Sequence, residues 1–187
     1  MGTNTFIGID PGKTGALCIL YKDEPFFVDW PKDDSLLSLI NDVNDVVYTI
    51  HDTFEVYDTF ESFVDNTNLF CIIEQQSSRP LQGAPATFKS GMNYGMWLMF
   101  LAMYKVPHRI IHPNTIFKGI VPVVAKKSKM KAAERKKLQK KENYKTACRL
   151  FPRDAHLLTG TRRGIKDGRA DALLMAYKAK LIETKGE

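Results

Sequence analysis

Two acidic residues each follow a short apolar run that is typical of a buried strand. Asp10 comes after residues 6–9, and Glu74 comes after residues 69–73. A carboxylate that ends a strand emerges at the edge of the sheet, where a ligand has access to it. Each residue also has a plainer explanation, because Asp10 opens an Asp-Pro-Gly turn and a charge often ends a strand. Taken together, they are candidate ligands for a cation.

A second acidic pair lies near the C-terminus. Asp167 and Asp171 are four residues apart, which places both on one face of a helix, one turn from each other. Asp167 also suits a helix N-cap. Asp171 is harder to explain as a structural residue, because Ala170, Leu174 and Met175 are its apolar neighbours. The two like charges repel each other, and a bound divalent cation would compensate them.

The four carboxylates together suit phosphodiester hydrolysis. Mg²⁺ prefers carboxylate oxygens and retained waters as ligands. Two such ions about 4 Å apart stabilise both the attacking and the leaving oxygen of the displacement. The acidic residues therefore favour a metal-dependent reaction on a phosphodiester, with a basic flank to hold the polyanion.

Charge is unevenly distributed along the 187 residues, whose net charge is +6. Residues 1–104 contain 5 Lys and Arg against 14 Asp and Glu, whereas residues 105–187 contain 22 against 7. The run 126–145 alone holds ten Lys and Arg and two Glu. Such a segment suits the backbone of a nucleic acid, which binds with strong salt dependence. A solvated basic helix explains the composition alone equally well.

The elements that must position these side chains follow one another in a mixed pattern. Two β-prone runs flank the turn residues 11–15, which predicts a hairpin, and a third run extends it into a meander. Further along, helical periodicity alternates with short apolar runs. The predicted strands are 6–10, 16–21, 25–28, 69–73 and 109–111, and the predicted helices are 34–50, 91–104, 114–118, 144–151 and 167–182, with a polar loop over 75–90.

This order predicts an α/β fold with a mixed five-stranded sheet, antiparallel over the first three strands and parallel over the last two, flanked by helices. The length suits a single domain over residues 1–187. Residues 51–68 are either a helical extension or an insertion. No apolar stretch reaches the roughly 20 residues of a membrane span, and the first residues lack a signal-peptide layout. We therefore expect a soluble intracellular protein of the cytoplasm or nucleoid, of a virus-infected host, or of an organelle.

Six short motifs, spread over most of the chain, resemble those of one nuclease family. The motifs are Ile7-Gly8-Ile9-Asp10-Pro11-Gly12 with Gly15, Ile72-Ile73-Glu74-Gln75, Gly91-x-x-Tyr94-Gly95-x-Trp97, Pro113-x-x-x-x-Lys118, Leu150-Phe151-Pro152 and Asp167-Gly168-Arg169-Ala170-Asp171-Ala172-Leu173. In this order they resemble the motifs of the RuvC-type Holliday junction resolvases of the RNase H-like superfamily. The sequence is most similar to the branch that includes phage resolvases and the monokaryotic-chloroplast resolvase.

The resemblance implies an RNase H-like fold and a structure-selective endonuclease that resolves four-way DNA junctions by paired symmetric nicks. It implies a catalytic tetrad of Asp10, Glu74, Asp167 and Asp171 that holds two Mg²⁺ ions, for which Mn²⁺ substitutes. Asp10 is expected to bridge both ions, Glu74 and Asp171 to hold one each, and Asp167 to complete the site or orient the attacking water. A homodimer is also implied, because two active sites must act on opposed strands.

The same resemblance implies cations beside the scissile phosphate. Lys118 matches a family lysine at that place and is a further catalytic candidate, and either Lys140 or Lys141 is expected to supply a second one. The full set of cations expected to contact nucleic acid is Lys13, Arg79, Lys89, Lys118, Lys140, Lys141, Arg162, Arg163, Lys166 and Arg169.

Three features depart from the pattern of the bacterial resolvases. Their last two metal ligands are three residues apart, whereas the spacing here is four, as in the chloroplast-type branch. They carry an aromatic side chain three residues after the glutamate, where this chain has Ser77. Phe88 is the nearest aromatic residue, and we expect it to be buried. Residues 51–68 and about 122–140 are expected to be insertions.

Other functions fit parts of the sequence. Residues 10–15 also resemble the first phosphate loop of the actin and sugar-kinase superfamily, although those chains are usually far longer and carry a second phosphate loop that this sequence lacks. An RNase H-like nuclease acting on other branched DNA or on RNA–DNA hybrids is another possibility, as is a junction-binding protein without nuclease activity. The intact acidic set argues against a non-catalytic protein, and the Gly-Arg-Ala-Asp-Ala-Leu segment favours a resolvase over RNase H.

Overall fold

The computed structural model describes residues 4–54, 59–78, 82–125, 130–160 and 164–185. Its centre is a five-stranded sheet with the order β3-β2-β1-β4-β5. The first three strands pair antiparallel, whereas β4 pairs parallel with both β1 and β5. The mixed sheet that the sequence predicts is thereby confirmed. The strands are β1 (Asn4–Asp10), β2 (Ala16–Tyr21), β3 (Glu24–Asp29), β4 (Asn68–Glu74) and β5 (His108–Ile111).

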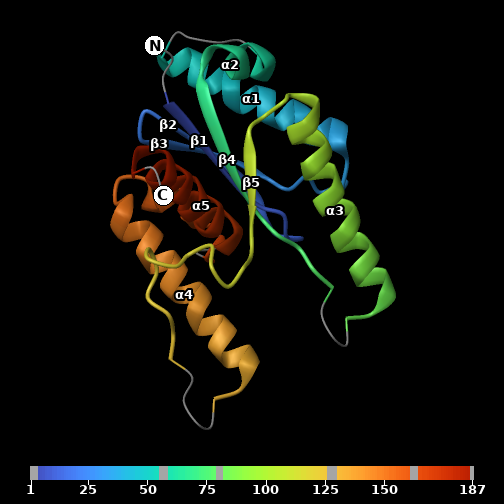
Figure 1. The fold of residues 1–187 in the computed structure, drawn as a ribbon, viewed down its shortest axis with the longest axis vertical. Coiled ribbons are helices and arrows are strands. Elements are labelled where there is room, and N and C mark those ends of the chain that lie inside the picture. The colour runs from blue at the N-terminus through green and yellow to red at the C-terminus, as the bar shows by residue number, and fades with distance from the viewer. Residues whose placement is uncertain (1–3, 55–58, 79–81, 126–129, 161–163, 186–187) are drawn as a thin grey trace.

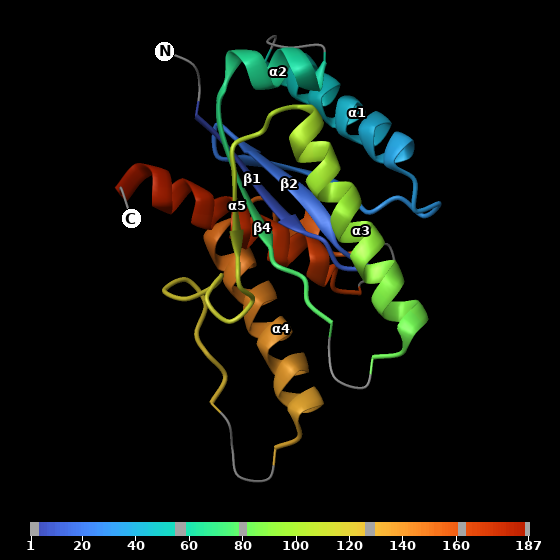
Figure 2. The same cartoon turned by 45° about the vertical axis from the view of Figure 1, so that its right-hand side comes forward.

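Helices cover both faces of this sheet (Figures 1 and 2). One face is covered by α1 (Leu36–Phe54), α2 (Phe60–Asn66) and α3 (Ala84–Met103), and the other by α4 (Ala132–Leu150) and α5 (Asp167–Lys185). The alternation of side chains along β1 explains this division, because Ile7 and Ile9 pack with the first layer and Phe6 with the second. The N-terminal halves of α3 and α4 extend past the carboxyl ends of β1 and β4 (Figure 1).

In the middle of the chain, two predicted elements differ from those observed. The helix α3 begins at Ala84, seven residues before the predicted start, and the polar loop is correspondingly shorter. Pro85 lies in the first turn, where its missing N–H leaves no helical hydrogen bond unmade. Residues 114–118 form consecutive turns instead of the predicted helix, with hydrogen bonds such as that from Ile116 N to His112 O.

The segment without a clear sequence assignment is largely helical. The helix α1 continues through Phe54, and α2 begins at Phe60. Thr59 caps α2, since its hydroxyl accepts a hydrogen bond from Ser62 N at 3.2 Å. Residues 55–58 between the two helices lie outside the described part of the chain.

Both C-terminal helices are longer than the sequence predicts. The predicted helix 144–151 is the end of α4, which already begins at Ala132, and α5 starts at Asp167 as predicted but continues to Lys185. The basic run therefore lies mostly on α4. No helix within the described ranges combines the length and the apolarity needed to cross a membrane.

Candidate active site

The strand register brings Asp10 and Glu74 to the same edge of the sheet. In the parallel pair of β1 and β4, Ile9 lies opposite Ile73. The next residue on each strand is the acidic one, so the two carboxylates stand at the carboxyl ends of neighbouring strands. Ile9 and Ile73 face the layer of α1 and α3. Because side chains alternate along a strand, Asp10 and Glu74 face α4 and α5.

Two glycines allow α5 to approach this edge. A Cβ atom on Gly8 would lie 2.0 Å from the carbonyl oxygen of Ala172, and one on Gly168 would lie 2.0 Å from that of Thr14. Neither position accepts a side chain unless the backbone of α5 or of the β1–β2 turn moves. The two contacts bring the acidic first turns of α5 to the ends of β1 and β4.

Asp10 is recessed in the turn that follows β1. Gly12 N donates a hydrogen bond to Asp10 Oδ1 at 3.0 Å. Burial is the largest effect on the carboxyl and raises its pKa. The Gly12 N–H and the charge of Lys140 oppose this rise, Asp167 adds to it, and Lys136 opposes it weakly. The net result is a raised pKa for Asp10.

Asp171 is the carboxyl most affected by its surroundings. The pKa of Asp171 is raised to about 8. Burial of the carboxyl group is the largest cause, although part of the residue remains accessible, and the charge of Asp10 is the second. Glu74 also raises this pKa, so its side chain lies within electrostatic reach. Asn143 opposes the rise, since its Nδ2 donates to Asp171 Oδ1 at 2.7 Å, and Lys140 does so by its charge. Carboxyls perturbed in this way are typical of functional sites.

Lys140 on α4 stands among three of the four candidate ligands. Its Nζ forms an ion pair with Asp167 Oδ2. Desolvation lowers the pKa of Lys140, but the bond to Asp167 and the charges of Asp171 and Asp10 together outweigh it and leave the pKa raised. The ammonium group therefore compensates part of the repulsion within the acidic cluster, which we define as Asp10, Glu74, Asp167 and Asp171.

The chemistry of the acidic cluster suits a divalent cation. All four members are carboxylates, the ligands that Mg²⁺ and Mn²⁺ prefer, and their mutual repulsion calls for a cation. Among the described residues, however, no three His, Cys, Asp or Glu side chains converge closely enough to hold an ion. Metal binding would require these side chains to move inward and the Lys140 ammonium to withdraw.

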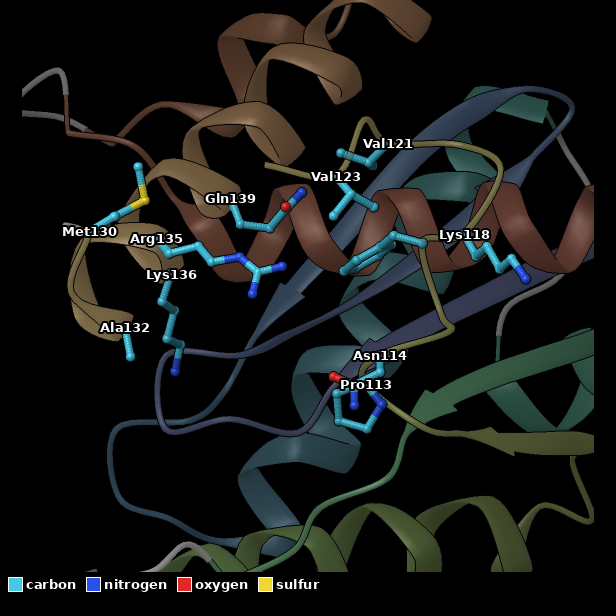
Figure 3. Close-up of a pocket in the computed structure, with 11 residues that line it drawn as sticks. Pro113, Asn114, Lys118, Val121, Val123, Met130, Ala132, Arg135, Lys136 and Gln139 are labelled. Atoms are coloured by element: carbon cyan, nitrogen blue, oxygen red, sulfur yellow. The ribbon is translucent and has the colours of Figure 1, made fainter. Parts of the chain in front are cut away.

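A cavity of about 820 Å³ lies between the segment 113–124 and the N-terminal half of α4 (Figure 3). Its cations are Lys118, Arg135 and Lys136. Lys136 connects it to the acidic cluster, because its charge lowers the pKa of Asp10. Figure 3 shows the Lys118 side chain extending away from Arg135 and Lys136. We call this cavity the basic cavity. Its remaining lining residues are Pro113, Asn114, Phe117, Val121, Val123, Met130, Ala132 and Gln139.

Besides Lys140, which pairs with Asp167, three of the predicted nucleic-acid contacts form ion pairs within the chain. Lys89 on α3 lies 2.6 Å from Asp34. Lys166 and Arg169 both bind Asp29, at 2.8 Å and 2.6 Å. The Arg169 guanidinium also bonds to a backbone carbonyl, so its position is fixed by the fold. These pairs give the three cations a structural role, and their contact with nucleic acid stays a prediction.

The other predicted contacts are exposed or lie outside the described residues. Lys13 is exposed on the β1–β2 turn, and Lys141 is exposed on α4 beside Lys140. Of the two neighbouring lysines, the structure brings only Lys140 into the acidic cluster. The predicted contacts outside the described part of the chain are Arg79, Arg162 and Arg163.

Two polar residues of the site, Gln139 and Asn143, are not predicted from the sequence. Both lie within the basic run 126–145, whose charge dominates its composition, and neither belongs to one of the six motifs. Their spacing could have indicated a shared role, because Arg135, Gln139 and Asn143 are four residues apart and therefore lie on one face of α4.

The expectation that Phe88 is buried is wrong, since 74% of the residue is exposed. The early start of α3 places Phe88 in its second turn, opposite the side that packs on the sheet. Trp97 and Phe100, which lie on that inner side, are fully buried.

Comparison with solved structures identifies the fold. The structure of T. thermophilus RuvC in complex with a Holliday junction substrate gives a TM-score of 0.52 at 14% sequence identity, covering 100% of this chain and 97% of that chain. Another Thermus thermophilus RuvC structure gives 0.51 at 15% identity, covering 97% and 96%. The yeast mitochondrial Holliday junction resolvase Ydc2 gives 0.44 at 17% identity, covering 94% and 77%. No protein-family model matches the sequence, and no curated protein matches it significantly.

The similarity to the RuvC structures extends over nearly the whole of both chains. It includes the mixed five-stranded sheet and the helices on its two faces. The chain therefore has a RuvC-like RNase H fold.

Proposed function

We propose that the protein is a structure-selective endodeoxyribonuclease that resolves four-way DNA junctions by paired, symmetric nicks. The acidic cluster carries this proposal, because the fold brings four carboxylates from two strands and a helix into electrostatic contact beside a basic cavity. The RuvC-like fold supports it, since one similar structure is RuvC in complex with a Holliday junction substrate. The four-residue spacing of Asp167 and Asp171 is our reason for favouring the phage and chloroplast branch.

The proposed reaction uses two Mg²⁺ ions, for which Mn²⁺ substitutes. Asp10 would serve both ions, Glu74 and Asp171 one each, and Asp167 would complete the site. When bound, ions of this kind lower the pKa of water and stabilise charge on the attacking and leaving oxygens. The raised pKa of Asp171 means that this carboxyl holds a proton at neutral pH without a metal, and cation binding would release that proton.

The cations around the acidic cluster would hold the reacting strand. Lys140, once withdrawn from Asp167, is free to contact a phosphate next to the cluster. Arg135 and Lys136 line the basic cavity from α4, and Lys118 lines it from the segment 113–124. Phosphate contacts of this type position a strand without reading its sequence. Together they would orient the scissile phosphate toward the carboxylates.

We place the homodimer interface on the outer face of α3. Glycine costs a helix about 1 kcal/mol relative to alanine. Gly91 and Gly95 nevertheless lie on this face, and a Cβ atom on either would meet none of the described residues within 4 Å, so packing within the described part of the chain does not require them. A second copy packed closely against α3 would explain both glycines. It would also cover the exposed apolar side chains of the same face, Met92, Met99 and Met103.

Phe88 is the group that we propose to stack on bases at the junction centre. It is exposed near the N-terminal end of α3, which extends past the carboxyl ends of the strands. Aromatic rings bind unstacked bases without regard to sequence. Phe88 would thus supply the aromatic ring that the bacterial resolvases carry three residues after the glutamate, where this chain has Ser77.

Cleavage of matched substrates tests the proposal. A labelled four-way junction, a linear duplex and an RNA–DNA hybrid are incubated with the protein in Mg²⁺. We expect cuts in the junction alone, with 5′-phosphate and 3′-hydroxyl ends, and loss of activity in Asp10→Asn and Asp171→Asn. Asp65→Asn, which alters an exposed carboxylate on α2, is the control and should cleave normally.

Three outcomes would contradict the proposal. Equal cleavage of the linear duplex would remove the structural selectivity. Cleavage of the hybrid instead of the junction would identify an RNase H. Tight junction binding without any cleavage would indicate a non-catalytic binding protein.

A further inference from the structure

A line of hydrogen bonds connects the wall of the basic cavity to Asp171. Val124 N donates to Gln139 Oε1 at 2.9 Å. Gln139 Nε2 donates to Asn143 Oδ1 at 3.3 Å, and Asn143 Nδ2 donates to Asp171 Oδ1 at 2.7 Å. Asn143 is 4% exposed, so its polar atoms depend on these partners. The line therefore begins at a backbone amide and ends at a carboxylate of the acidic cluster.

The backbone fixes the direction of every bond in this line. A backbone N–H only donates, so Val124 requires the oxygen of the Gln139 amide to face it. The carbonyl of Pro122 only accepts and lies 3.1 Å from Gln139 Nε2, which agrees with that orientation. Asn143 must then present its oxygen to Gln139 and its NH₂ group to Asp171. The donor that faces Asp171 is thus set by the segment 122–124.

A further contact holds this segment against α4. Arg135 Nε donates to Val124 O at 3.1 Å, one turn before Gln139. Val121 and Val123, the neighbouring residues of the segment, line the basic cavity. Arg135 and Gln139 thus hold the cavity wall against α4, and Gln139 is also the residue that links this wall to Asn143 and Asp171.

We propose that Gln139 and Asn143 are positioning residues that orient the Asp171 carboxylate for a divalent cation. This inference rests on the proposed function, because it assumes that Asp171 is a metal ligand. The bond from Asn143 occupies Oδ1 and leaves Oδ2 as the oxygen available to a cation. Outer partners of this kind typically change metal affinity or activity by about 10-fold to 100-fold.

The substitution Gln139→Glu tests the direction of the bonds. The glutamate still accepts from Val124 N, but it has no donor for Asn143, whose amide then loses its fixed orientation. We expect Mn²⁺ to bind about 10-fold more weakly than to the wild type. If the new carboxylate acted only through its charge, Mn²⁺ would instead bind more tightly. The direction of the change in Mn²⁺ affinity therefore distinguishes the two effects. Mn²⁺ binding is measured by electron paramagnetic resonance on the full chain without DNA.

Two further variants complete the design. Asn143→Ala removes the donor itself, and we expect weaker Mn²⁺ binding together with junction cleavage that recovers at high Mn²⁺ concentration. Leu138→Glu adds the same charge at an exposed neighbouring position, and its Mn²⁺ affinity should equal or exceed that of the wild type. Thermal melting in EDTA verifies that each variant is folded.

The possible failures are distinguishable. If the wild type binds Mn²⁺ and cleaves junctions while Gln139→Glu binds Mn²⁺ as tightly as Leu138→Glu, the positioning role is wrong and the proposed function stands. If cleavage by a folded Asn143→Ala variant does not recover with Mn²⁺, the positioning role is likewise overturned. If the wild type binds no Mn²⁺ and cleaves nothing, the proposed function itself is contradicted.

Discussion

The fold places the carboxyl group of Asp171 where its ionised form is disfavoured. Burial and the neighbouring Asp10 carboxylate both act against its ionisation, whereas Asn143 and Lys140 favour it. Such an arrangement lowers stability in the absence of a cation, as is common where function requires grouped charges. The cost should therefore be measurable in the metal-free protein.

Stability of the metal-free protein is expected to depend on ionisation of Asp171. Its pKa is about 8 in the folded chain against an ordinary value of 3.8, so the folded state binds the proton more tightly. Proton binding by this group contributes fully to the free energy of unfolding below pH about 4. This contribution is lost as the pH rises toward 8, by at most about 1.4 kcal/mol per pH unit. We expect Asp171→Asn in EDTA to be more stable than the wild type at pH 8, with the difference shrinking toward pH 4.

Urea unfolding at a series of pH values measures this effect. Asp65→Asn is the matched control, because the same substitution at an exposed position on α2 should leave the pH dependence of the wild type unchanged. If the Asp171→Asn and wild-type curves run parallel between pH 4 and 8, the raised pKa of Asp171 is wrong.

At the scale of elements, the close contact between α5 and β1 assembles the acidic cluster. Gly8 and Gly168 let the helix approach β1 and the following turn without an intervening side chain. The parallel pairing of β1 and β4 then supplies the other two carboxylates at the same edge. The geometry of the site thus depends on residues that perform no chemistry.

Gly8→Ala tests this dependence. Its Cβ would overlap the Ala172 carbonyl oxygen and the Ala176 amide nitrogen, which lie 2.0 Å and 2.4 Å away. The helix must shift, and we expect the free energy of unfolding to fall by about 1–3 kcal/mol, as for other overpacked sites. Gly164→Ala, where a Cβ would meet no described residue within 4 Å, should be neutral. Equal stability of the two variants would show that α5 does not need the close contact.

Much of this arrangement follows from the sequence. Apolar runs that end in Asp10 and Glu74 predict the strand ends, and the spacing of Asp167 and Asp171 predicts a shared helical face. The start of α3 is missed because Pro85 reads as a loop residue, although proline also suits a first helical turn. The role of Asn143 is missed for another reason, since its partner Asp171 lies 28 residues away and only tertiary packing brings them together.

At the scale of the whole molecule, the acidic and basic halves of the sequence are not separate regions. Asp10 and Glu74 come from the acidic half, yet Asp10 lies within electrostatic reach of Lys140 and Lys136 of the basic half, and Glu74 lies within reach of Asp171. The single domain 1–187 remains our proposal, with 51–68 and 122–140 as insertions. The second of these provides the start of α4 and one wall of the basic cavity.

The dimer interface on α3 is open to a direct test. Met99→Glu places a charge in the centre of the exposed apolar face. Because burial of an unpaired charge is costly, we expect this variant to be monomeric under conditions in which the wild type is a dimer. Sedimentation velocity measures the change, with Asn41→Glu on the exposed side of α1 as control. A wild-type monomer, or a dimer that persists in Met99→Glu, would rule out this interface.

Cleavage of a supercoiled plasmid that extrudes a cruciform tests the central claim most directly. A dimer with two acidic clusters should cut both opposed strands within one binding event in Mg²⁺. We expect linear plasmid as the first product, with two cuts placed symmetrically about the junction, and no product from Asp10→Asn. Accumulation of nicked circles without linear plasmid, or equal cutting of a plasmid that lacks the cruciform, would contradict it.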